Sequence, residues 1–292
     1  LRFKGEALNK HRGRVGYPLR AWLMLVDVFL YFLKTEVSFG AEQIQVVVGV
    51  QAHLFYPLSP EVVAFSTRRE GGVSQGAYAT FNANPYCGDS PSDVAENRKR
   101  LAAELGLDAS CLVVPHQVHG TEIAFVQGPC ALEGVDAVVT QTPGLCVCVS
   151  TADCIPVLLY DAVHGAVAAI HAGWRGTVAD IVGLTVSFMQ ERCATRPSDL
   201  QAVIGPGIGV DAFEGGDEVY QAFCDAGFPM AQTAIRKAKW HIDLWKANEW
   251  LLRRAGVGNI TMAGICTYHQ QDEFFSARRL GIRSGRILNG IF

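Results

Sequence analysis

The stretch TADCIPVLLYDAVHGAVAAIHAGWRG, residues 151–176, contains the strongest structural signal in this chain. Two runs within it, residues 155–160 and 166–172, are almost entirely apolar, which is typical of strands covered on both faces. Cys154 and His171 stand at the ends of these runs, where a rigid scaffold projects reactive groups. The stretch therefore predicts two buried strands that carry a thiol and an imidazole at their ends.

The same pattern of short apolar runs continues on both sides of this stretch. Short apolar runs divided by Gly, Pro and Asp predict strands at residues 44–50 and 62–68 and six strands between 111 and 172. Helices are expected from an N-cap at Ser90 to Gly106, from an N-cap at Thr177 to about residue 193, and from Asp243 to about residue 255. The pattern predicts an α/β or α+β fold class with no linker between two domains.

The composition limits the classes of partner. Lys and Arg total 25 against 28 Asp and Glu, and the net charge of −3 provides no basic field for a nucleic-acid backbone. The nine cysteines are an odd number, lack a CxxC pair and often lie within apolar runs such as LCVCVS. The cysteine usage indicates reduced thiols in a cytoplasmic protein, and the charge indicates that nucleic acid is not a partner.

The first 45 residues are expected to be an N-terminal extension of uncertain role, ahead of a domain over residues 46–292. Basic residues at 11–20 precede an apolar run at 21–33, as in a signal peptide. The apolar run is shorter than the roughly 20 residues that span a bilayer, and Asp27 interrupts it. A targeting leader and an extension that is helical or disordered both stay open, and no membrane partner is expected.

Three residues in this pattern can form a metal site: His119, Cys154 and His171. Their spacings, 35 residues from 119 to 154 and 17 from 154 to 171, match no zinc-finger pattern, so the fold would have to assemble the site. Two imidazoles and one thiolate leave a fourth position open for water or substrate. The same residues are also compatible with buried structural side chains, or with a Cys154 nucleophile activated by a histidine.

Two further segments are candidates for binding substrate oxygens. AGWRGT precedes a helix, so that Gly173 and Gly176 would let an anion approach the backbone beside Arg175. Arg68 and Asn82 lie in a polar stretch suited to binding hydroxyl or phosphate oxygens. A tight turn and a solvated loop are the alternatives for these two segments.

The C-terminal segment EFFSARR places Arg278 near the end of a strand. Arg278 is thus a candidate for lining a pocket. Cys266, in GICTYH, is expected to pack in the core instead.

These motifs occur together and in one order: TRREGGVSQGAY, PHQVHGTEI, DAVVTQTPG, TADCIPVLLYD, IHAGWRGT, IGPGIG, GDEV and FFSARR. In this combination the chain resembles the YfiH-like family, also called the laccase-domain or multicopper polyphenol oxidase family, over roughly residues 50–292. The resemblance implies a single α/β (α+β) domain of mixed β-sheets flanked by helices, similar to the catalytic fold of cytotoxic necrotizing factor. It also implies that His119, Cys154 and His171 are the metal ligands.

The resemblance implies a purine nucleoside phosphorylase that also deaminates adenosine and cleaves methylthioadenosine, with Zn²⁺ or Cu²⁺ as cofactor. Other members are phenol oxidases or peptidoglycan editing factors. The chain departs from the family pattern after IGPGIG, where a Cys-Cys-Tyr-Glu run is usual and only Phe213 and Glu214 keep the aromatic residue and the acid. Asn82 carries over from the family's Leu-Asn-Leu-Gly form, but its neighbours do not.

The histidine count argues against a complete multicopper oxidase site. A type 1 copper with a trinuclear cluster needs about eight imidazoles for the cluster alone, largely in HxH pairs. This chain has eight histidines in total, and none form an HxH pair. One copper in the His119, Cys154 and His171 site remains the oxidase alternative.

The sequence therefore favours one pocket, with a metal and its water at one end, phosphate near Arg68 and Arg175, and a purine between them. Asp153, beside the thiolate, is expected to support the ligands or carry a proton. Purine nucleosides and phosphate are the expected partners of a monomer or small homo-oligomer. Two alternatives stay open: a Cys-His amidohydrolase, and an interaction module whose structural zinc takes His116 as a fourth ligand.

Overall fold

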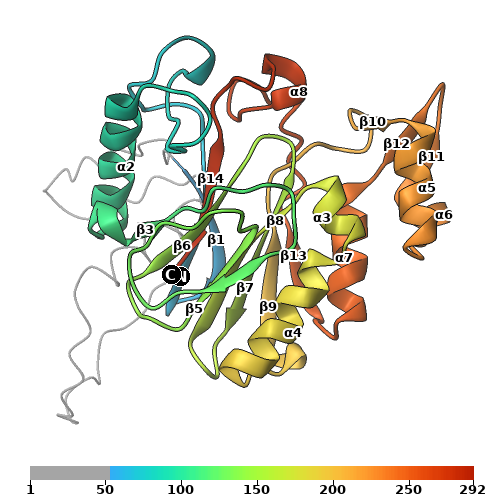
Figure 1. The fold of residues 1–292 in the computed structure, drawn as a ribbon, viewed down its shortest axis with the longest axis horizontal. Helices are drawn as coiled ribbons and strands as arrows, with labels where there is room; N and C mark the ends of the chain where they lie inside the picture. The colour runs from blue at the N-terminus through green and yellow to red at the C-terminus, as the bar shows by residue number, and fades with distance from the viewer. Residues whose placement is uncertain (1–52) are drawn as a thin grey trace, which may run out of the picture. The chain divides into compact units, whose positions relative to one another are not determined.

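Two mixed β-sheets lie face to face at the centre of residues 53–292, the part of the chain that this computed structural model describes (Figure 1). The five-stranded sheet has the order β1 (His53–Ser59), β2 (Val62–Thr67), β14 (Ile287–Ile291), β6 (Cys146–Thr151) and β3 (Leu112–Val113). The six-stranded sheet has the order β13 (Asn259–Met262), β9 (Leu200–Ile204), β7 (Ile155–Asp161), β8 (Ala166–Ala172), β5 (Ala137–Thr140) and β4 (Ile123–Phe125). The mixed sheets confirm the predicted fold class.

The two apolar runs of the 151–176 stretch form an antiparallel pair in the middle of the six-stranded sheet. Strand β7 pairs with β8 from Ile155 opposite Ala172 to Asp161 opposite Ala166. Alternate side chains of β7 point to opposite faces: Val157 and Leu159 pack toward the helices, whereas Leu158 and Tyr160 pack between the sheets. Burial on both faces explains why these strands lack polar alternation.

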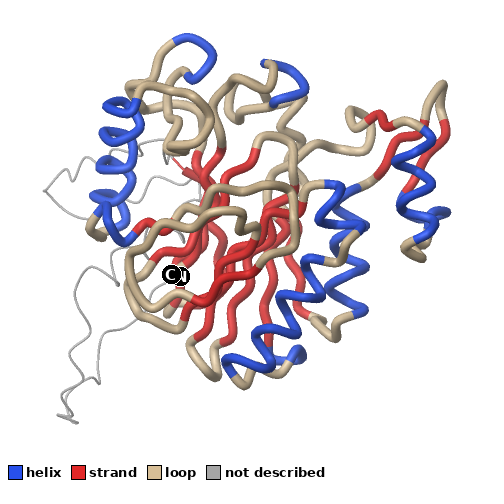
Figure 2. Tube along the Cα trace, viewed as in Figure 1, coloured by secondary structure: helices blue, strands red, loops and turns tan. Residues whose placement is uncertain are grey.

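Helices cover the outer face of each sheet, which gives four layers (Figure 2). The six-stranded sheet is covered by α3 (Trp174–Val178), α4 (Ile181–Cys193) and α7 (Leu244–Arg254). Helix α2 (Pro91–Leu105) packs against the outer face of the five-stranded sheet through Leu101 and Leu105. Short 3-10 turns occur at Gly76–Tyr78, Ala109–Cys111 and Pro197–Asp199.

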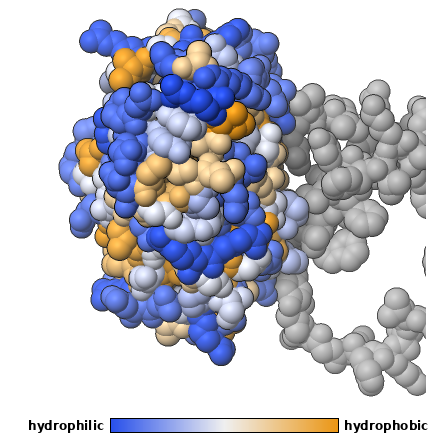
Figure 3. Space-filling view, turned by 90° about the vertical axis from the view of Figure 1, so that its right-hand side faces the viewer, coloured by the Kyte–Doolittle hydropathy of each residue, from blue (hydrophilic) through white to orange (hydrophobic). Residues whose placement is uncertain are grey.

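A small third sheet forms an arm at one side of the described part. It consists of β10 (Glu214–Gly215), β12 (Trp240–Ile242) and β11 (Ala234–Arg236), with α5 (Asp217–Asp225) and α6 (Met230–Thr233) beside it (Figure 1). On the face shown in Figure 3, hydrophobic residues occur in small areas bordered by hydrophilic ones. The short helix α8 (Ala277–Leu280) precedes β14 and completes the described elements.

The predicted helix ends are correct at two helices and wrong at one. Gly106 ends α2 in the left-handed conformation, with φ of 71°, and the Asp243 side chain caps α7 at the backbone N–H of Lys246. Thr177, however, is not an N-cap. It lies inside α3, where its hydroxyl contacts Asn248, and α4 begins after Asp180, whose carboxylate accepts the Gly183 N–H.

Several predictions concern residues outside the described part. The N-terminal extension of residues 1–45, its apolar run at 21–33 and the strand at 44–50 all belong there. The boundary of the 46–292 domain stays a prediction. Between residues 53 and 292, no helix has both the length and the apolar character that crossing a bilayer demands.

Candidate metal centre and substrate pocket

Three side chains from separate elements converge at one end of the two central sheets. His119 follows β3, Cys154 lies in the turn between β6 and β7, and His171 lies near the end of β8. Their ligand atoms all lie within 4.8 Å of one another. His119 is exposed, Cys154 is half-buried and His171 is buried, so the group opens to solvent on the His119 side. The fold thus brings the three predicted ligands together.

The Asp136 carboxylate fixes the positions of the two histidines of this group. This carboxylate is fully buried and accepts the backbone N–H groups of Val118, His119 and Gly120 at 3.2, 3.0 and 2.7 Å. Oδ1 of Asp136 also contacts Nδ1 of His171 at 2.7 Å. Because Nδ1 of His171 is engaged by the carboxylate, Nε2 is the nitrogen that can bind a metal. One buried carboxylate thus orients both histidines.

The charges of the group favour a thiolate. Burial raises the pKa of Cys154, but the charge of His171 and hydrogen bonds from both imidazoles outweigh it and lower the pKa to about 6. Burial likewise disfavours the His171 imidazolium, yet the Cys154 thiolate and the Asp136 carboxylate raise the pKa of His171 to about 9. A thiolate is both the metal-binding and the nucleophilic form of cysteine, so the lowered pKa is compatible with Cys154 as a metal ligand and with Cys154 as a nucleophile.

Gly173 leaves room in front of these ligands. A Cβ atom at this position would lie 2.9 Å from Cδ2 of His119 and 3.1 Å from Sγ of Cys154, both closer than ordinary contacts. The backbone of Gly173 has φ of −67° and ψ of 167°, which other residues adopt freely. The glycine is therefore required by space and not by conformation. The donor set and this cleared space fit a small metal ion with one open position.

His116 does not join the three ligands. Its Nδ1 contacts the Glu133 carboxylate at 2.7 Å, and its ring stacks on Tyr86 at 4.7 Å between centroids. Throughout residues 53–292, the group that can hold a metal consists of His119, Cys154 and His171. The fourth protein ligand that a closed structural zinc site needs is thus not supplied by His116.

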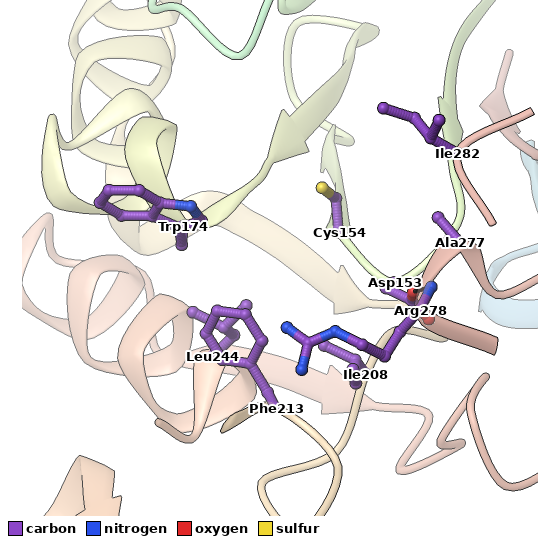
Figure 4. A pocket seen from close by; sticks show the side chains of 9 residues that line it. All are labelled: Asp153, Cys154, Trp174, Ile208, Phe213, Leu244, Ala277, Arg278 and Ile282. Carbon is purple, nitrogen blue, oxygen red and sulfur yellow. Dashed lines mark hydrogen bonds between the residues drawn. The ribbon is translucent and has the colours of Figure 1, made fainter. Parts of the chain in front are cut away.

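A cavity of about 380 Å³ adjoins the Cys154 side of the centre (Figure 4). This volume lies within the roughly 300–1,000 Å³ that is usual for small-molecule sites. In Figure 4 the Trp174 side chain lies on the opposite side of the cavity from Ala277 and Ile282. The lining is apolar except for Asp153, Cys154 and Arg278. It comprises Asp153, Cys154, Trp174, Ile208, Phe213, Leu244, Ala277, Arg278 and Ile282.

Asp153 lines the cavity, but both of its carboxylate oxygens are engaged by the protein. Oδ1 accepts the Thr267 hydroxyl at 2.8 Å, and Oδ2 accepts the backbone N–H of Arg278 at 2.7 Å. The backbone of Asp153 has φ of 89°, a left-handed conformation that is strained for a side chain of this kind. These two hydrogen bonds connect the turn that carries Cys154 to the segments before β14. The expected role of Asp153 as a proton carrier stays a prediction.

The three residues expected to bind substrate, Arg68, Asn82 and Arg175, are not among those that line the cavity. Arg68 forms an ion pair with Glu273, and Arg175 is exposed with its guanidinium 4.4 Å from the centroid of the Trp174 ring. The helix after Gly173 has five residues, so it offers little of the dipole that would attract an anion. Their substrate-binding roles stay predictions.

Asn82 is fully buried inside its loop. Its Nδ2 donates to the Asp89 carboxylate at 2.9 Å, and its Oδ1 accepts the backbone N–H of Arg286 at 3.1 Å. These contacts join the polar loop to the segment before β14. The amide group thus has a structural task in the described part of the chain.

The sequence offered signals for some of the remaining site residues. Arg278 was expected near a pocket, and Phe213 was singled out as the aromatic residue kept after IGPGIG; both line the cavity. Asp136 was missed, although it is the first residue of the DAVVTQ run and stands directly before β5, because only the fold shows which backbone groups it faces. Leu244 and Ile282 are ordinary apolar residues whose place in the lining no local pattern indicates.

Comparisons with known proteins identify the family of this chain. Residues 63–292 match the family model described as multi-copper polyphenol oxidoreductase laccase. A purine nucleoside phosphorylase of Bacteroides thetaiotaomicron is 49% identical over 78% of this chain and 90% of the relative. Adenosine deaminase RL5, from an unknown prokaryotic organism, is 42% identical over 79% of this chain and 94% of the relative.

A solved structure gives the same result for the fold. The crystal structure of the hypothetical protein YfiH of Bacillus licheniformis superposes with a TM-score of 0.79 at 30% identity. The superposition covers 82% of this chain and 96% of the other. Because the family model matches most of this chain, the chain belongs to the YfiH-like, multi-copper polyphenol oxidoreductase laccase family.

Proposed function

We propose that this protein is a metal-dependent purine nucleoside phosphorylase that also deaminates adenosine. The observation that carries the proposal is the convergence of His119, Cys154 and His171 within 4.8 Å of one another beside a largely apolar cavity of about 380 Å³. Relatives named for each of the two activities, at 49% and 42% identity, support the pairing. Purine nucleosides and phosphate are the proposed substrates.

The metal end of the pocket suits deamination. We assign His119, Cys154 and His171 as ligands for Zn²⁺ or Cu²⁺, a donor set of two imidazoles and one thiolate. A metal ion bound by these residues supplies Lewis acidity that activates water, as replacement of the purine 6-amino group requires. Asp136 keeps the His171 ring oriented, and Gly173 keeps the space in front of the ligands clear.

The apolar end of the pocket suits a purine nucleoside. Aromatic side chains of Trp174 and Phe213, with Leu244, offer flat and apolar faces for the base. In phosphorolysis a phosphate oxygen bonds to C1′ of the ribose while the C1′–N9 bond breaks, the electron pair passes to N9, and the base takes the proton of hydrogen phosphate. The apolar lining disfavours bulk water, which would compete with phosphate for C1′.

Oxidation of phenols is a second candidate, because the family description names it. Within the described range, metal-ligating side chains form one group of three, which suits one copper and not a trinuclear cluster. Oxygen consumption with a simple diphenol by copper-loaded protein, without nucleoside turnover, would favour this activity over phosphorolysis. Activity that survives chelation and ends when Cys154 is alkylated would instead indicate a Cys-His hydrolase.

We also propose a cytoplasmic location for the protein, as a monomer or small homo-oligomer. All nine cysteines are free, including the adjacent buried pair Cys146 and Cys148, whose sulfurs lie 3.5 Å apart. Free thiols in this number are usual in a reducing compartment. Sizing chromatography with and without reductant measures the oligomeric state.

The test of the proposed function is turnover of adenosine and inosine with and without phosphate, followed by chromatography of the bases. Wild-type protein of measured metal content should release base only with phosphate and should convert adenosine to inosine without it. Cys154→Ala should lose both activities, whereas Cys130→Ala, at an exposed cysteine outside the cavity, should retain them. Metal-replete wild type that forms neither free base nor inosine would contradict the proposal.

A further inference from the structure

We propose that Arg278 is the residue that binds the phosphate substrate in this pocket. The inference rests on the proposed function and deepens it, because phosphorolysis needs a site for an anion next to the ribose. Arg278 is the basic residue among the nine that line the cavity, and it shares that lining with Cys154. The sequence had placed phosphate near Arg68 and Arg175 instead.

The guanidinium of Arg278 keeps its positive charge available to a ligand. Its Nη1 and Nη2 donate only to backbone carbonyls, of Glu214 at 3.3 Å each and of Ala212 at 3.5 Å. No carboxylate within residues 53–292 forms an ion pair with it, since the Glu214 carboxylate pairs with Lys239. Contacts to neutral carbonyls orient the group without neutralising it.

Two further contacts aim Arg278 into the cavity. The backbone N–H of Arg278 is fixed by Oδ2 of Asp153, the residue next to Cys154. The guanidinium carbon lies 5.6 Å from the centroid of the Phe213 ring, within the range of a cation–π contact. In Figure 4 the guanidinium reaches from the Asp153 side of the pocket toward Phe213 and Leu244. The planar group can therefore present two parallel N–H donors to phosphate oxygens.

The two arginines expected from sequence are less suited to this task. The Arg68 guanidinium is paired with Glu273 and lies over the Phe274 ring, at 5.6 Å from its centroid. The Arg175 guanidinium lies over the Trp174 ring, 4.4 Å from its centroid, and neither Arg68 nor Arg175 lines the cavity. An anion bound at either place would therefore lie outside the lining that includes Cys154.

The geometry also gives Asp153 a positioning role. Its two oxygens bind Thr267 and the Arg278 backbone, so its own charge is turned toward the protein and not toward an incoming anion. This contact links the turn that carries Cys154 to the segment that carries Arg278. Asp153 thereby connects the metal end of the pocket to the backbone of the residue at the phosphate end.

The experiment measures phosphorolysis of inosine at varied phosphate concentration by Arg278→Gln and Arg278→Lys holoenzymes. Loss of a charge-assisted hydrogen bond should raise the KM for phosphate about 10- to 100-fold in Arg278→Gln, and less in Arg278→Lys, which keeps the charge but loses the planar fork. Arg279→Gln is the matched control. Its side chain contacts Gln271 and the Tyr268 ring outside the cavity, and its KM for phosphate should equal that of the wild type.

A binding measurement separates this inference from the proposed function. Inorganic phosphate should raise the Tm of wild-type and Arg279→Gln proteins but not that of Arg278→Gln, whether or not nucleosides are turned over. If phosphate protects in this pattern while wild type shows no phosphorolysis, the proposed function fails and the phosphate site stands. If phosphorolysis occurs but Arg278→Gln keeps the wild-type KM for phosphate, or Arg175→Gln raises that KM more, the Arg278 assignment is overturned.

Discussion

The two ends of the pocket are built in different ways. The metal-ligand end is supported by a fully buried carboxylate, Asp136, which makes four hydrogen bonds to the segment around His119 and to His171. The opposite wall comes from the β10 segment and the segment around α8, where Arg278 is exposed and Ile282 is 80% exposed. The contrast suggests a rigid chemical centre facing a wall that can vary with the substrate.

The strongest test of the rigidity of the metal-ligand end is to fill the space that Gly173 leaves beside His119 and Cys154. Gly173→Ala places a methyl group against His119 and Cys154 without backbone strain, because φ at this position is −67°. A displacement of the ligands on this scale should lower kcat by at least about 100-fold. Metal content and activity of the purified variant measure the effect.

The control for this variant is Gly128→Ala, where a Cβ atom would meet nothing within 4 Å and φ is not positive. It should retain metal and activity. If Gly173→Ala binds metal and turns over substrate as well as Gly128→Ala does, the centre is not rigid and the contrast between the two ends is lost.

The next test removes the charge beneath the centre. Asp136→Asn should lower metal affinity about 10- to 100-fold, because the carboxylate that orients the His171 ring becomes a neutral amide. Titration with a competing chelator measures the affinity, and thermal unfolding of the metal-free protein measures the accompanying loss of stability.

Asp161→Asn is a matched control for Asp136→Asn. Asp161 is equally buried, and its carboxylate also binds a histidine, Nδ1 of His164 at 2.8 Å, together with backbone N–H groups. It lies at the other end of β7 from Cys154, so this variant should lower Tm without changing metal affinity. Equal losses of metal affinity in both variants would mean that Asp136 acts through stability alone.

The variable wall is tested at its aromatic residue. Phe213→Ala should raise the KM for nucleosides about tenfold and leave metal affinity unchanged, since the ring lines the apolar part of the cavity proposed to hold the base and is not one of the metal-ligand group. Steady-state kinetics with adenosine and inosine measure the effect. Leu184→Ala, on an exposed position of α4, provides the control. A loss of metal from Phe213→Ala would show that the two ends are coupled.

The same contrast explains how much could be predicted from the sequence. The β7 and β8 strands are evident because burial on both faces leaves charged and imidazole side chains only near their ends, at Asp161 and His171. The convergence of His119, Cys154 and His171 was predicted too, because each residue stands where an apolar run meets a turn. Their roles as ligands stay predictions.

The missed elements are those whose stability depends on distant partners. Strand β14 was not predicted because Asn289 and Gly290 interrupt its apolar pattern. In the fold Asn289 accepts the Ser66 hydroxyl at 2.6 Å, and a Cβ atom at 290 would lie 2.6 Å from the Phe65 ring. The short strands β10 to β12 and most of the pocket wall likewise depend on contacts that no local pattern reveals.

The smallest expected effect lies at the surface of the variable wall. Lys239 and Glu214 form an ion pair at 2.7 Å, but their side chains are 63% and 42% exposed. Solvent screens such a pair, so Lys239→Gln should change the KM for nucleoside and phosphate by less than about twofold. Kinetics at low and high salt test this expectation. A larger change that grows at low salt would mean that the freed Glu214 carboxylate turns to the Arg278 guanidinium and competes with phosphate there, which would tie the wall's surface charges directly to catalysis.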